Sequence, residues 1–352
     1  MRAVHVVVPD GIDDPARPSG GNTYDRHLCR ELGSCGWTAH VRAVPGFWGR
    51  AGAASFAALE EAVQRIPDHA VVLLDGLVAS GAPEVLVPQA RRLRLIALVH
   101  MPLGHRPADE DARRREGAVL AAATSVVTTS AWARRRLLEL YGLPGHRVYV
   151  AEPGVEAAEP ASGTISGGEL LCVGPVTSEK GHDVLLGALE SISDLSWSCA
   201  CVGSLDRDPP FVERLRRRTR EAGLADRISF AGPRSGGGLD RSYASADLLV
   251  SASRAETYGL VVTEALARGL PVIAAEVGGL PEALGEAAGG IRPGVLVPAE
   301  DPAALGDALR GWLCDTALRA RLRLAAGERR ESLPRWSTTA STVARALAEA
   351  EP

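Results

Sequence analysis

The segment from Ser253 to Pro271 places two glutamates, Glu256 and Glu264, eight positions apart on either side of Gly259. Its pattern predicts a helix over Gly259–Arg268. The free backbone N–H groups and partial positive charge at the start of such a helix suit a diphosphate. Glu256, just before the helix, could reach sugar hydroxyls beside the phosphates. Glu264, more than one turn further along, could accept hydrogen bonds from a ribose diol.

The glutamate spacing is weak evidence on its own, because such pairs occur by chance and usually line a solvated helix face. The order of the surrounding features adds to it. A predicted strand, Asp247–Ser251, comes first, and Gly269-Leu-Pro271 then stops the helix and opens the next strand. Strand, Glu-x-Tyr-Gly, helix and Gly-x-Pro together favour a ligand site.

Lys180 is the single lysine among 39 basic residues, and all the others are arginines. In a chain whose default cation is arginine, a retained lysine indicates a position that needs a compact ammonium group. Chance survival of one lysine is an equally simple explanation.

The length and composition of the chain favour a folded protein of two domains and argue against nucleic-acid binding. The chain has 352 residues, 46% of them hydrophobic and 23% charged, which is enough for two packed domains and excludes global disorder. A formal net charge of −4 and an aromatic content of 4% argue against a nucleic-acid-binding surface.

The cysteines and the hydropathy pattern exclude several other classes. The six cysteines form no C-x-x-C pair, and we interpret them as reduced thiols of a cytoplasmic protein without a zinc site or disulfide frame. The first residues, MRAVHVVVPDG, have too short an apolar run for a signal peptide and predict a strand. No apolar stretch approaches the roughly 18 residues of a membrane span.

Short apolar runs alternate with longer helical patterns, which predicts parallel sheets covered on both faces. In the first half, strands are expected at Ala3–Val8, Ala39–Val44, Ala70–Leu74, Leu93–His100, Ser125–Thr128 and Arg147–Val150, and helices at Thr23–Gly33, Ser55–Arg65, Asp109–Ala123 and Ala131–Leu140. Glu152–Gly168, rich in Pro, Gly, Ser and Ala, interrupts this alternation and is typical of a linker.

The alternation then resumes. Strands are expected at Leu170–Val173, Trp197–Val202, Ile228–Ala231, Ala246–Ser251 and Pro271–Ala274, and helices at Asp183–Ser191, Pro210–Glu221, Ser242–Ala246, Gly259–Arg268, Pro281–Leu284, Pro302–Cys314, Ala317–Glu331 and Thr338–Ala350. The fold class is therefore α/β, with two doubly wound, Rossmann-like domains. Ligands of such sheets bind at the carboxyl ends of the strands, which predicts a site in a cleft between the domains.

Further motifs accompany the glutamate segment in a fixed order. They are Gly20-Gly21, Pro153-Gly154-Val155, Val173-Gly174 followed by Glu179-Lys180-Gly181, and Val277-Gly278-Gly279-Leu280-Pro281-Glu282. With the Glu-x7-Glu element, this set resembles the retaining GT-B glycosyltransferases of family GT4. The resemblance implies a GT-B fold, in which two Rossmann-like domains face each other across a cleft.

The resemblance also implies roles for individual residues. His100, Lys180 and Glu256 would be the catalytic residues: a histidine near the transferred sugar, a cation on the diphosphate and a carboxylate on the sugar hydroxyls. The donor-binding residues would be Gly20, Gly21, Arg234, Tyr258, Gly259, Leu260, Val261 and Glu264. Glu264 would hold the ribose, Arg234 would lie near the nucleobase, and Gly20 and Gly21 would form a loop closing over the phosphates. No metal ligand or other cofactor is expected.

One position departs from the family pattern. Family members usually have Gly-Arg before the Lys-Gly segment, whereas this chain has Gly174-Pro175. A phosphate-binding cation is therefore missing, and Arg234 and Arg254 are the candidates to replace it.

The expected domains are residues 1–155 on the acceptor side, a linker at 156–168, a nucleotide-sugar-binding domain at 169–333, and a C-terminal helix at 334–352 that packs back on the first domain. Three loops are expected to shape the acceptor pocket: Pro45–Gly52 with Phe47 and Trp48, Asp75–Gly81, and Met101–Asp111. They contain no long basic or amphipathic stretch, which favours a small soluble acceptor over a lipid.

With this resemblance, the sequence predicts metal-independent transfer of a sugar, with retention, from a nucleotide donor to an acceptor hydroxyl. UDP is the nucleotide that the resemblance favours, with GDP and ADP open. Three alternatives stay open at this point. One is another GT-B enzyme, such as a sugar-nucleotide epimerase or a phosphorylase. The second is a non-catalytic sugar-nucleotide sensor. The third, a dinucleotide-binding dehydrogenase, is disfavoured because no G-x-G-x-x-G follows the first strand.

Overall fold

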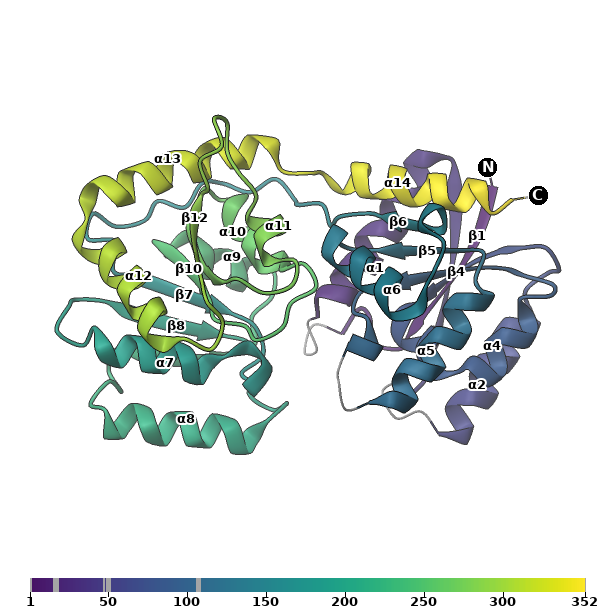
Figure 1. The fold of residues 1–352 in the computed structure, drawn as a ribbon, viewed down its shortest axis with the longest axis horizontal. Coiled ribbons are helices and arrows are strands. Elements are labelled where there is room, and N and C mark those ends of the chain that lie inside the picture. Colours follow the sequence, from purple (N-terminus) through teal and green to yellow (C-terminus); the bar gives the residue numbers. More distant parts are fainter. Residues whose placement is uncertain (1, 15–18, 47, 49–51, 106–108, 352) are drawn as a thin grey trace. The chain divides into compact units, whose positions relative to one another are not determined.

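The computed structural model describes residues 2–14, 19–46, 48, 52–105 and 109–351. The chain forms two compact units (Figure 1). The first unit contains Met1–Gly154 together with Pro334–Pro352, and the second contains Val155–Leu333.

The first unit is built on a parallel six-stranded sheet in the order β2-β1-β3-β4-β5-β6. Its strands are β1 (Arg2–Pro9), β2 (Trp37–Val44), β3 (Val71–Asp75), β4 (Arg94–Val99), β5 (Ser125–Thr128) and β6 (Val148–Val150). Its α-helices are α1 (Gly20–Glu31), α2 (Ala53–Gln64), α3 (Gly76–Gly81), α4 (Pro83–Gln89), α5 (Glu110–Ala122), α6 (Ala131–Tyr141) and α14 (Trp336–Glu349). Short 3₁₀ turns are η1 (Leu32–Cys35), η3 (Leu103–His105) and η4 (Gly145–Arg147).

Central strands β3 and β4 are apolar runs buried along almost their whole length, as expected of a parallel sheet covered on both faces. On one face, α2, α3, α4 and α5 pack over a core that includes Leu59, Leu74 and Leu86. Helix α14 contacts α1, β5 and β6, so the C-terminal residues complete the first unit. The hydroxyl of Thr339 in α14 donates to the carbonyl of Glu152 at 2.6 Å.

The second unit has another parallel six-stranded sheet, in the order β12-β11-β10-β7-β8-β9. Its strands are β7 (Glu169–Val173), β8 (Ser198–Val202), β9 (Ile228–Gly232), β10 (Leu248–Ser251), β11 (Val272–Ala275) and β12 (Gly294–Val297). Its helices are η5 (Ser178–Lys180), α7 (His182–Ser191), α8 (Pro209–Glu221), α9 (Gly237–Ala244), α10 (Leu260–Leu266), α11 (Leu280–Leu284), α12 (Pro302–Cys314) and α13 (Thr316–Ser332).

Both faces of this second sheet are covered, which explains its continuous apolar strands. Residues of α7, α8 and α12 share one core with β7 and β8, around Leu185, Leu215 and Trp312. Residues of α9, α10 and α11 share the other core, around Tyr243 and Val262. The strand order places the carboxyl ends of β7 and β10 side by side, which brings together the two motif-bearing segments that follow them.

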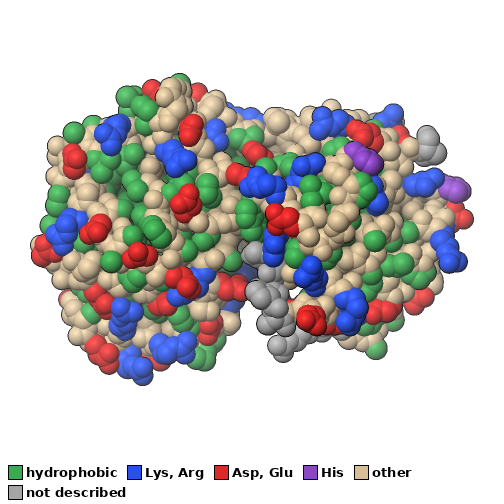
Figure 2. Space-filling view, viewed as in Figure 1, with side chains coloured by type: hydrophobic (Ala, Val, Ile, Leu, Met, Phe, Trp, Pro, Cys, Tyr) green, Lys and Arg blue, Asp and Glu red, His purple; other side chains and the backbone are tan. Residues whose placement is uncertain are grey.

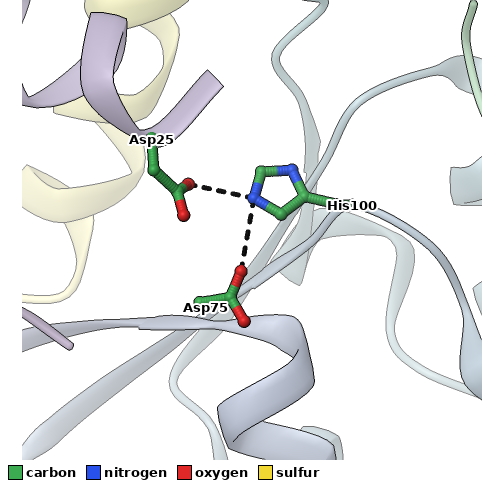
Figure 3. Close-up of side chains that lie close together, drawn as sticks. All are labelled: Asp25, Asp75 and His100. Atoms are coloured by element: carbon green, nitrogen blue, oxygen red, sulfur yellow. Dashed lines mark hydrogen bonds and ion pairs between the residues drawn. The ribbon is translucent and has the colours of Figure 1, made fainter. Parts of the chain in front are cut away.

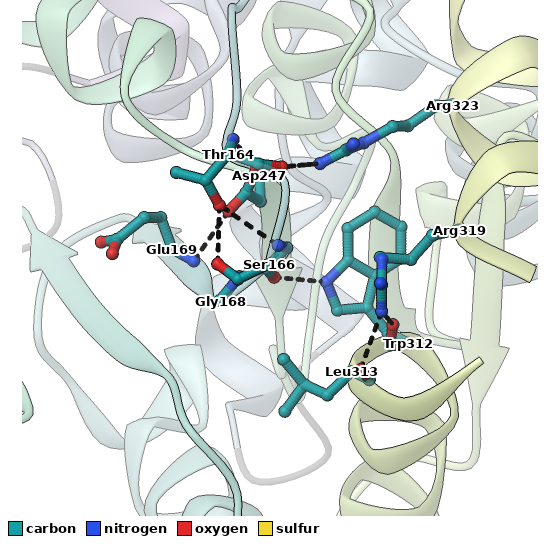
Figure 4. Close-up of polar contacts among 10 residues, drawn as sticks. Thr164, Ser166, Gly168, Glu169, Asp247, Trp312, Leu313, Arg319 and Arg323 are labelled. Atoms are coloured by element: carbon teal, nitrogen blue, oxygen red, sulfur yellow. Dashed lines mark hydrogen bonds and ion pairs between the residues drawn. The ribbon is translucent and has the colours of Figure 1, made fainter. Parts of the chain in front are cut away.

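The segment before β7 is fixed to the second unit by Asp247, whose side chain is fully buried (Figure 4). Its carboxylate accepts hydrogen bonds from the backbone N–H of Thr164, from the Thr164 hydroxyl at 2.6 Å and from the N–H of Glu169 at 2.9 Å. Arg323 of α13 donates to it at 2.9 Å. The composition of this segment predicts a linker, and the end nearest β7 is held in place by these bonds.

Several predicted loops have a different structure. Asp75–Gly81, expected to be an acceptor-side loop, is mainly helix α3, because the Asp75 carboxylate caps it by accepting from the N–H groups of Leu77 and Val78 at 2.8 and 3.3 Å. Gly20 and Gly21 likewise open helix α1, capped by Ser19, and do not form a loop.

Trp48 was expected to line the acceptor pocket, and that prediction is wrong. The indole is 4% exposed and packs in the core of the first unit, with its Nε1–H donating to the carbonyl of Val44 at 3.3 Å. Phe47 and residues 49–51 of the same predicted loop, and residues 106–108 of the third one, lie outside the described residues.

Helix α4 and strand β12 were not predicted, and α9 begins at Gly237, five residues earlier than expected.

Among the described helices, none combines the length and the apolarity that crossing a bilayer requires. On the face shown in Figure 2, basic and acidic side chains are interspersed over the surface of each unit. This distribution agrees with the small formal net charge of −4.

Candidate active site

Lys180 and Glu256, which are 76 positions apart, form an ion pair in the second unit. The Lys180 ammonium donates to Glu256 Oε1, and the Ser253 hydroxyl donates to the same oxygen at 3.2 Å. The side chains are 27% and 14% exposed, so the pair is accessible at its edge. Sequence reasoning assigned both residues to one ligand, and the structure brings them together.

Two segments that contain glycine allow the backbone around Lys180 and Glu256 to approach closely. Gly181 has a positive φ of 65°, and a Cβ there would lie 1.9 Å from the carbonyl oxygen of Ala252, so only glycine lets the Lys180 turn approach the chain after β10. Gly278 also has a positive φ, and its Cβ would lie 1.6 Å from the Glu256 carbonyl oxygen. The N–H of Gly279 donates to that carbonyl at 3.0 Å. The Gly278-Gly279 turn therefore holds the backbone of Glu256 in place.

Glu264 lies in α10, where its Oε2 accepts from the Tyr243 hydroxyl at 2.7 Å. Burial raises the pKa of Glu264, although the Tyr243 hydrogen bond and the Arg268 charge act in the opposite direction. The structure gives Oε1 no hydrogen bond to a described residue, which leaves an acceptor for a ligand. Gly259 precedes α10, and the first N–H groups of this helix, at Leu260 and Val261, have no acceptor within it. The predicted backbone and carboxylate groups thus lie on one stretch of chain, which is the connection from β10 to α10 and the helix itself.

The structure distinguishes the two candidates for the missing phosphate cation. Arg254 forms a bidentate pair with Asp183 at 2.9 and 2.8 Å and also donates to Glu300 at 2.6 Å. These carboxylates raise its pKa, and they occupy its guanidinium. Arg234 is exposed and makes one described hydrogen bond, to the Ser242 hydroxyl at 2.8 Å. Of the two, Arg234 is the one free to bind a ligand.

In the first unit, His100 lies directly after β4 and contacts two aspartates (Figure 3). Its Nε2 is 2.9 Å from Asp25 Oδ1 and 3.5 Å from Asp75 Oδ2. Asp25 comes from α1, and Asp75 ends the neighbouring strand β3. The two aspartates are 2% and 5% exposed, whereas the imidazole is 18% exposed. The histidine is therefore the accessible edge of a buried charged cluster.

The electrostatics of this cluster favour bound protons. Burial lowers the pKa of His100, but the Asp25 carboxylate, by charge and hydrogen bond, together with Asp75, raises it above its ordinary value overall. Burial and the Asp25 charge raise the pKa of Asp75 to about 6. Both shifts have the same sign, so the cluster holds protons more tightly than the isolated side chains do.

Packing fixes the orientation of the His100 ring. A Cβ at Gly21 would lie 3.2 Å from His100 Cδ2, so the small residue in α1 leaves room for the imidazole. Tyr24, also in α1, packs edge-to-face against the ring at 5.1 Å between centroids. Gly21 therefore lies against the predicted catalytic histidine, a contact that accounts for its small size without involving phosphate.

The chain immediately after His100 is held by Glu116, a buried carboxylate of α5. It accepts from the N–H groups of Leu103 and Gly104, both at 3.0 Å, and from the hydroxyls of Ser80 and Tyr141. The described start of the predicted Met101–Asp111 loop is thus anchored next to the histidine.

Among the described residues, the Asp25, Asp75 and His100 side chains are the group whose ligand atoms come within 4.8 Å of one another, close enough to consider a metal ion. The imidazole–carboxylate separations of 2.9 and 3.5 Å are those of a hydrogen bond and an ion pair. A proton on Nε2 satisfies them.

Sequence reasoning missed Asp25 and Asp75. Asp75 did carry a signal, because a carboxylate ending an apolar strand lies at the same sheet edge as His100 on the next strand. Asp25 carried none, since its position within α1 becomes meaningful only when the helix packs against the end of β4.

Family models match almost the whole chain in two parts. Residues 3–159 match Glycosyltransferase Family 4, and residues 166–329 match Glycosyl transferases group 1. The chain belongs to glycosyltransferase family 4. This confirms the resemblance inferred from the motifs.

Curated relatives of this family-4 chain include two bacterial D-inositol 3-phosphate glycosyltransferases. The one from Salinispora arenicola is 32% identical over 299 residues, covering 77% of this chain and 64% of the relative. The one from Acidothermus cellulolyticus is 34% identical over 228 residues, covering 59% and 49%. The chain thus spans between about half and two thirds of the length of these relatives.

Solved structures of similar fold include sucrose-phosphate synthase from Thermosynechococcus elongatus, with a TM-score of 0.79 at 22% identity over 99% of both chains. Anabaena HepE in complex with UDP-glucose gives a TM-score of 0.78 at 16% identity, covering 99% of this chain and 100% of that one. These similarities confirm the GT-B fold class, with two parallel α/β sheets.

Proposed function

We propose that this family-4 chain is a cytoplasmic enzyme that transfers a sugar, with retention, from a nucleoside diphosphate donor to a hydroxyl of a small soluble acceptor without a metal. The observation that carries the proposal is the Lys180–Glu256 ion pair next to the start of α10. A cation and a carboxylate that meet just before a helix with free N–H groups are groups that could bind a sugar diphosphate.

In the proposed donor complex, the Lys180 ammonium binds a diphosphate oxygen and stabilises the charge that develops as the sugar leaves. Glu256, which accepts from Lys180 in the free chain, then accepts hydrogen bonds from sugar hydroxyls. Glu264 binds the ribose through Oε1, while Tyr243 keeps hold of Oε2. Arg234 supplies the second cation, because Arg254 is paired with Asp183 and Glu300.

Retention needs no enzyme nucleophile in this scheme. The bond from the anomeric carbon to the diphosphate oxygen breaks, and its electron pair stays on the diphosphate. The acceptor oxygen attacks the same face, and its proton passes to a leaving phosphate oxygen. In this proposal His100 acts on the transferred sugar, which is the role that the family resemblance implies for it.

The names of the relatives and of the similar structures guide the choice of substrates. HepE binds UDP-glucose, which supports a UDP-sugar donor. Two curated relatives are D-inositol 3-phosphate glycosyltransferases, so a small polyol or its phosphate is the first acceptor to test. Product analysis with the donor alone and with the acceptor separates transfer from epimerisation.

The single lysine offers a direct test of diphosphate binding. Protein grown with lysine labelled by ¹³C at the ε position gives one lysine NMR signal, from Lys180. We expect UDP to shift this signal at saturation and uridine to leave it unchanged, because the ammonium would exchange Glu256 for phosphate oxygens. A signal unmoved by UDP under conditions where calorimetry detects binding would contradict the assignment.

The ribose contact predicts that Glu264→Ala weakens UDP binding by about tenfold or more, as expected for the loss of a charged hydrogen-bond acceptor. Tyr243→Phe is the matched control, because it removes only the hydrogen bond that the carboxylate accepts within the protein. Calorimetry with UDP measures both variants. Equal affinity of wild type and Glu264→Ala would exclude a ribose contact.

A further inference from the structure

The side chains of Asp25, Asp75 and His100 come from three elements of the first unit and lie close together (Figure 3). Helix α1 carries Asp25, while Asp75 and His100 stand at the carboxyl ends of the paired strands β3 and β4. The family motifs accounted for His100 alone. The function of the two aspartates therefore has to be argued from their contacts.

These contacts determine which imidazole nitrogen carries a proton. Nε2 faces both carboxylates, at 2.9 and 3.5 Å, so it must be a donor. Nδ1 lies on the ring edge away from both aspartates (Figure 3), and it makes no hydrogen bond to a described residue. With the aspartates buried and the imidazole 18% exposed, Nδ1 is the atom that a substrate can reach.

The charge balance then favours the doubly protonated ring. One Asp75 oxygen is committed to the helix cap, where it accepts from the N–H groups of Leu77 and Val78. Asp25 Oδ2 is buried with no hydrogen-bond partner among the described residues. With a neutral imidazole, two carboxylates would share this buried space without a counter-charge, which is costly in a poorly solvated site. An imidazolium compensates one of the charges.

The other groups facing the ring supply no competing charge. From α1, Tyr24 packs against the imidazole, and burial raises the pKa of its phenol well above the ordinary value, so the hydroxyl is neutral. That hydroxyl donates to the carbonyl of Ala151 at 2.9 Å. Among the described residues, the charges that act on His100 are those of Asp25 and Asp75.

We infer that Asp25 and Asp75 are positioning residues that keep His100 as an imidazolium with Nδ1–H directed at the substrate. This inference rests on the proposed function for the identity of that substrate. Held in this form, His100 is a hydrogen-bond donor to an oxygen of the transferred sugar or the leaving group. It is not the base that accepts the acceptor's proton, which leaves that step to the phosphate oxygen.

The test is a ¹⁵N NMR titration of the full chain labelled at histidine, because nitrogen shifts report separately on Nδ1 and Nε2. His100→Gln identifies the His100 signals among those of the eight histidines. In the wild type, we expect both ring nitrogens to be protonated at neutral pH. Asp25→Asn should lower the midpoint of Nδ1 deprotonation by about one pH unit or more, because it removes a negative charge in contact with the ring.

Asp68→Asn is the matched control, because Asp68 is an exposed, ion-paired aspartate of the same unit, and it should leave the midpoint unchanged. If Asp25→Asn does not fold, Asp75→Asn replaces it, with the amide oxygen retaining the cap of α3. An unperturbed His100 midpoint that neither variant moves would overturn the inference. So would one equivalent of tightly bound metal, measured by elemental mass spectrometry.

This readout requires neither substrate nor turnover, so it separates the inference from the proposed function. If the chain transfers sugar, the low-pH form is the active one, and kcat falls as pH rises through the Nδ1 midpoint. The fall should come at lower pH in Asp25→Asn, with KM little changed.

Discussion

Lys180→Ala is expected to lower kcat by about tenfold to a thousandfold while leaving the fold intact. The ammonium is preorganised by Glu256 and would meet the charge that forms on the diphosphate as the sugar departs. Steady-state kinetics with a nucleotide sugar and acceptor measure the loss. Because the Lys180 side chain is partly exposed, its removal should change the melting temperature little.

Two controls distinguish a loss of kcat caused by the missing phosphate contact from one caused by leaving the Glu256 carboxylate without its cation. Arg216→Ala removes an exposed cation from α8 of the same unit and should not affect turnover. Lys180→Ala combined with Glu256→Gln removes both members of the pair, so the remaining partner carries no uncompensated charge. If the double variant regained wild-type kcat, the loss in Lys180→Ala would come from the unpaired charge of Glu256. Unchanged turnover in Lys180→Ala itself would exclude a phosphate role for Lys180.

Asp247→Ala should destabilise the second unit by about 3–5 kcal/mol, the usual cost of breaking a buried charged network. The buried carboxylate accepts from two backbone N–H groups, from the Thr164 hydroxyl and from Arg323 (Figure 4). Its removal leaves the N–H groups of Thr164 and Glu169 without their acceptor. It also releases the segment that enters β7.

Hydrogen exchange followed by mass spectrometry is the appropriate measurement, because it reports on peptides of the two units separately. Faster exchange is expected across β7 and β10 in Asp247→Ala, and none in the first unit. Asp226→Ala, at an exposed position of the second unit, is the control and should behave as wild type. Protection of β7 that survives in Asp247→Ala would show that the segment is held by other contacts.

Much of this protein could be predicted from sequence because the signals are local. Apolar strands such as Val71–Asp75 and Leu248–Ser251 are buried on both faces, so they appear as short continuous runs between helical patterns. The Glu256–Glu264 element and Lys180-Gly181 follow strand ends, where α/β proteins bind ligands, and β7 and β10 are neighbours in the sheet. The family pattern predicted that Lys180 and Glu256 lie close together, and in the structure they form an ion pair.

What sequence could not provide depends on packing between distant segments. Asp25 is one polar residue in a helix until α1 packs against the end of β4, and only then does it meet His100, 75 positions away. Trp48 seemed suited to a binding loop, yet burying its large apolar surface in the core is favourable, since its Nε1–H finds an acceptor. Periodicity along the chain indicated the two sheets, and the resemblance to a known family indicated the nucleotide-sugar motifs. Tertiary contacts alone decided which side chains surround His100, which arginine is already paired, and which aromatic residue is buried, because these depend on distances between residues far apart in sequence.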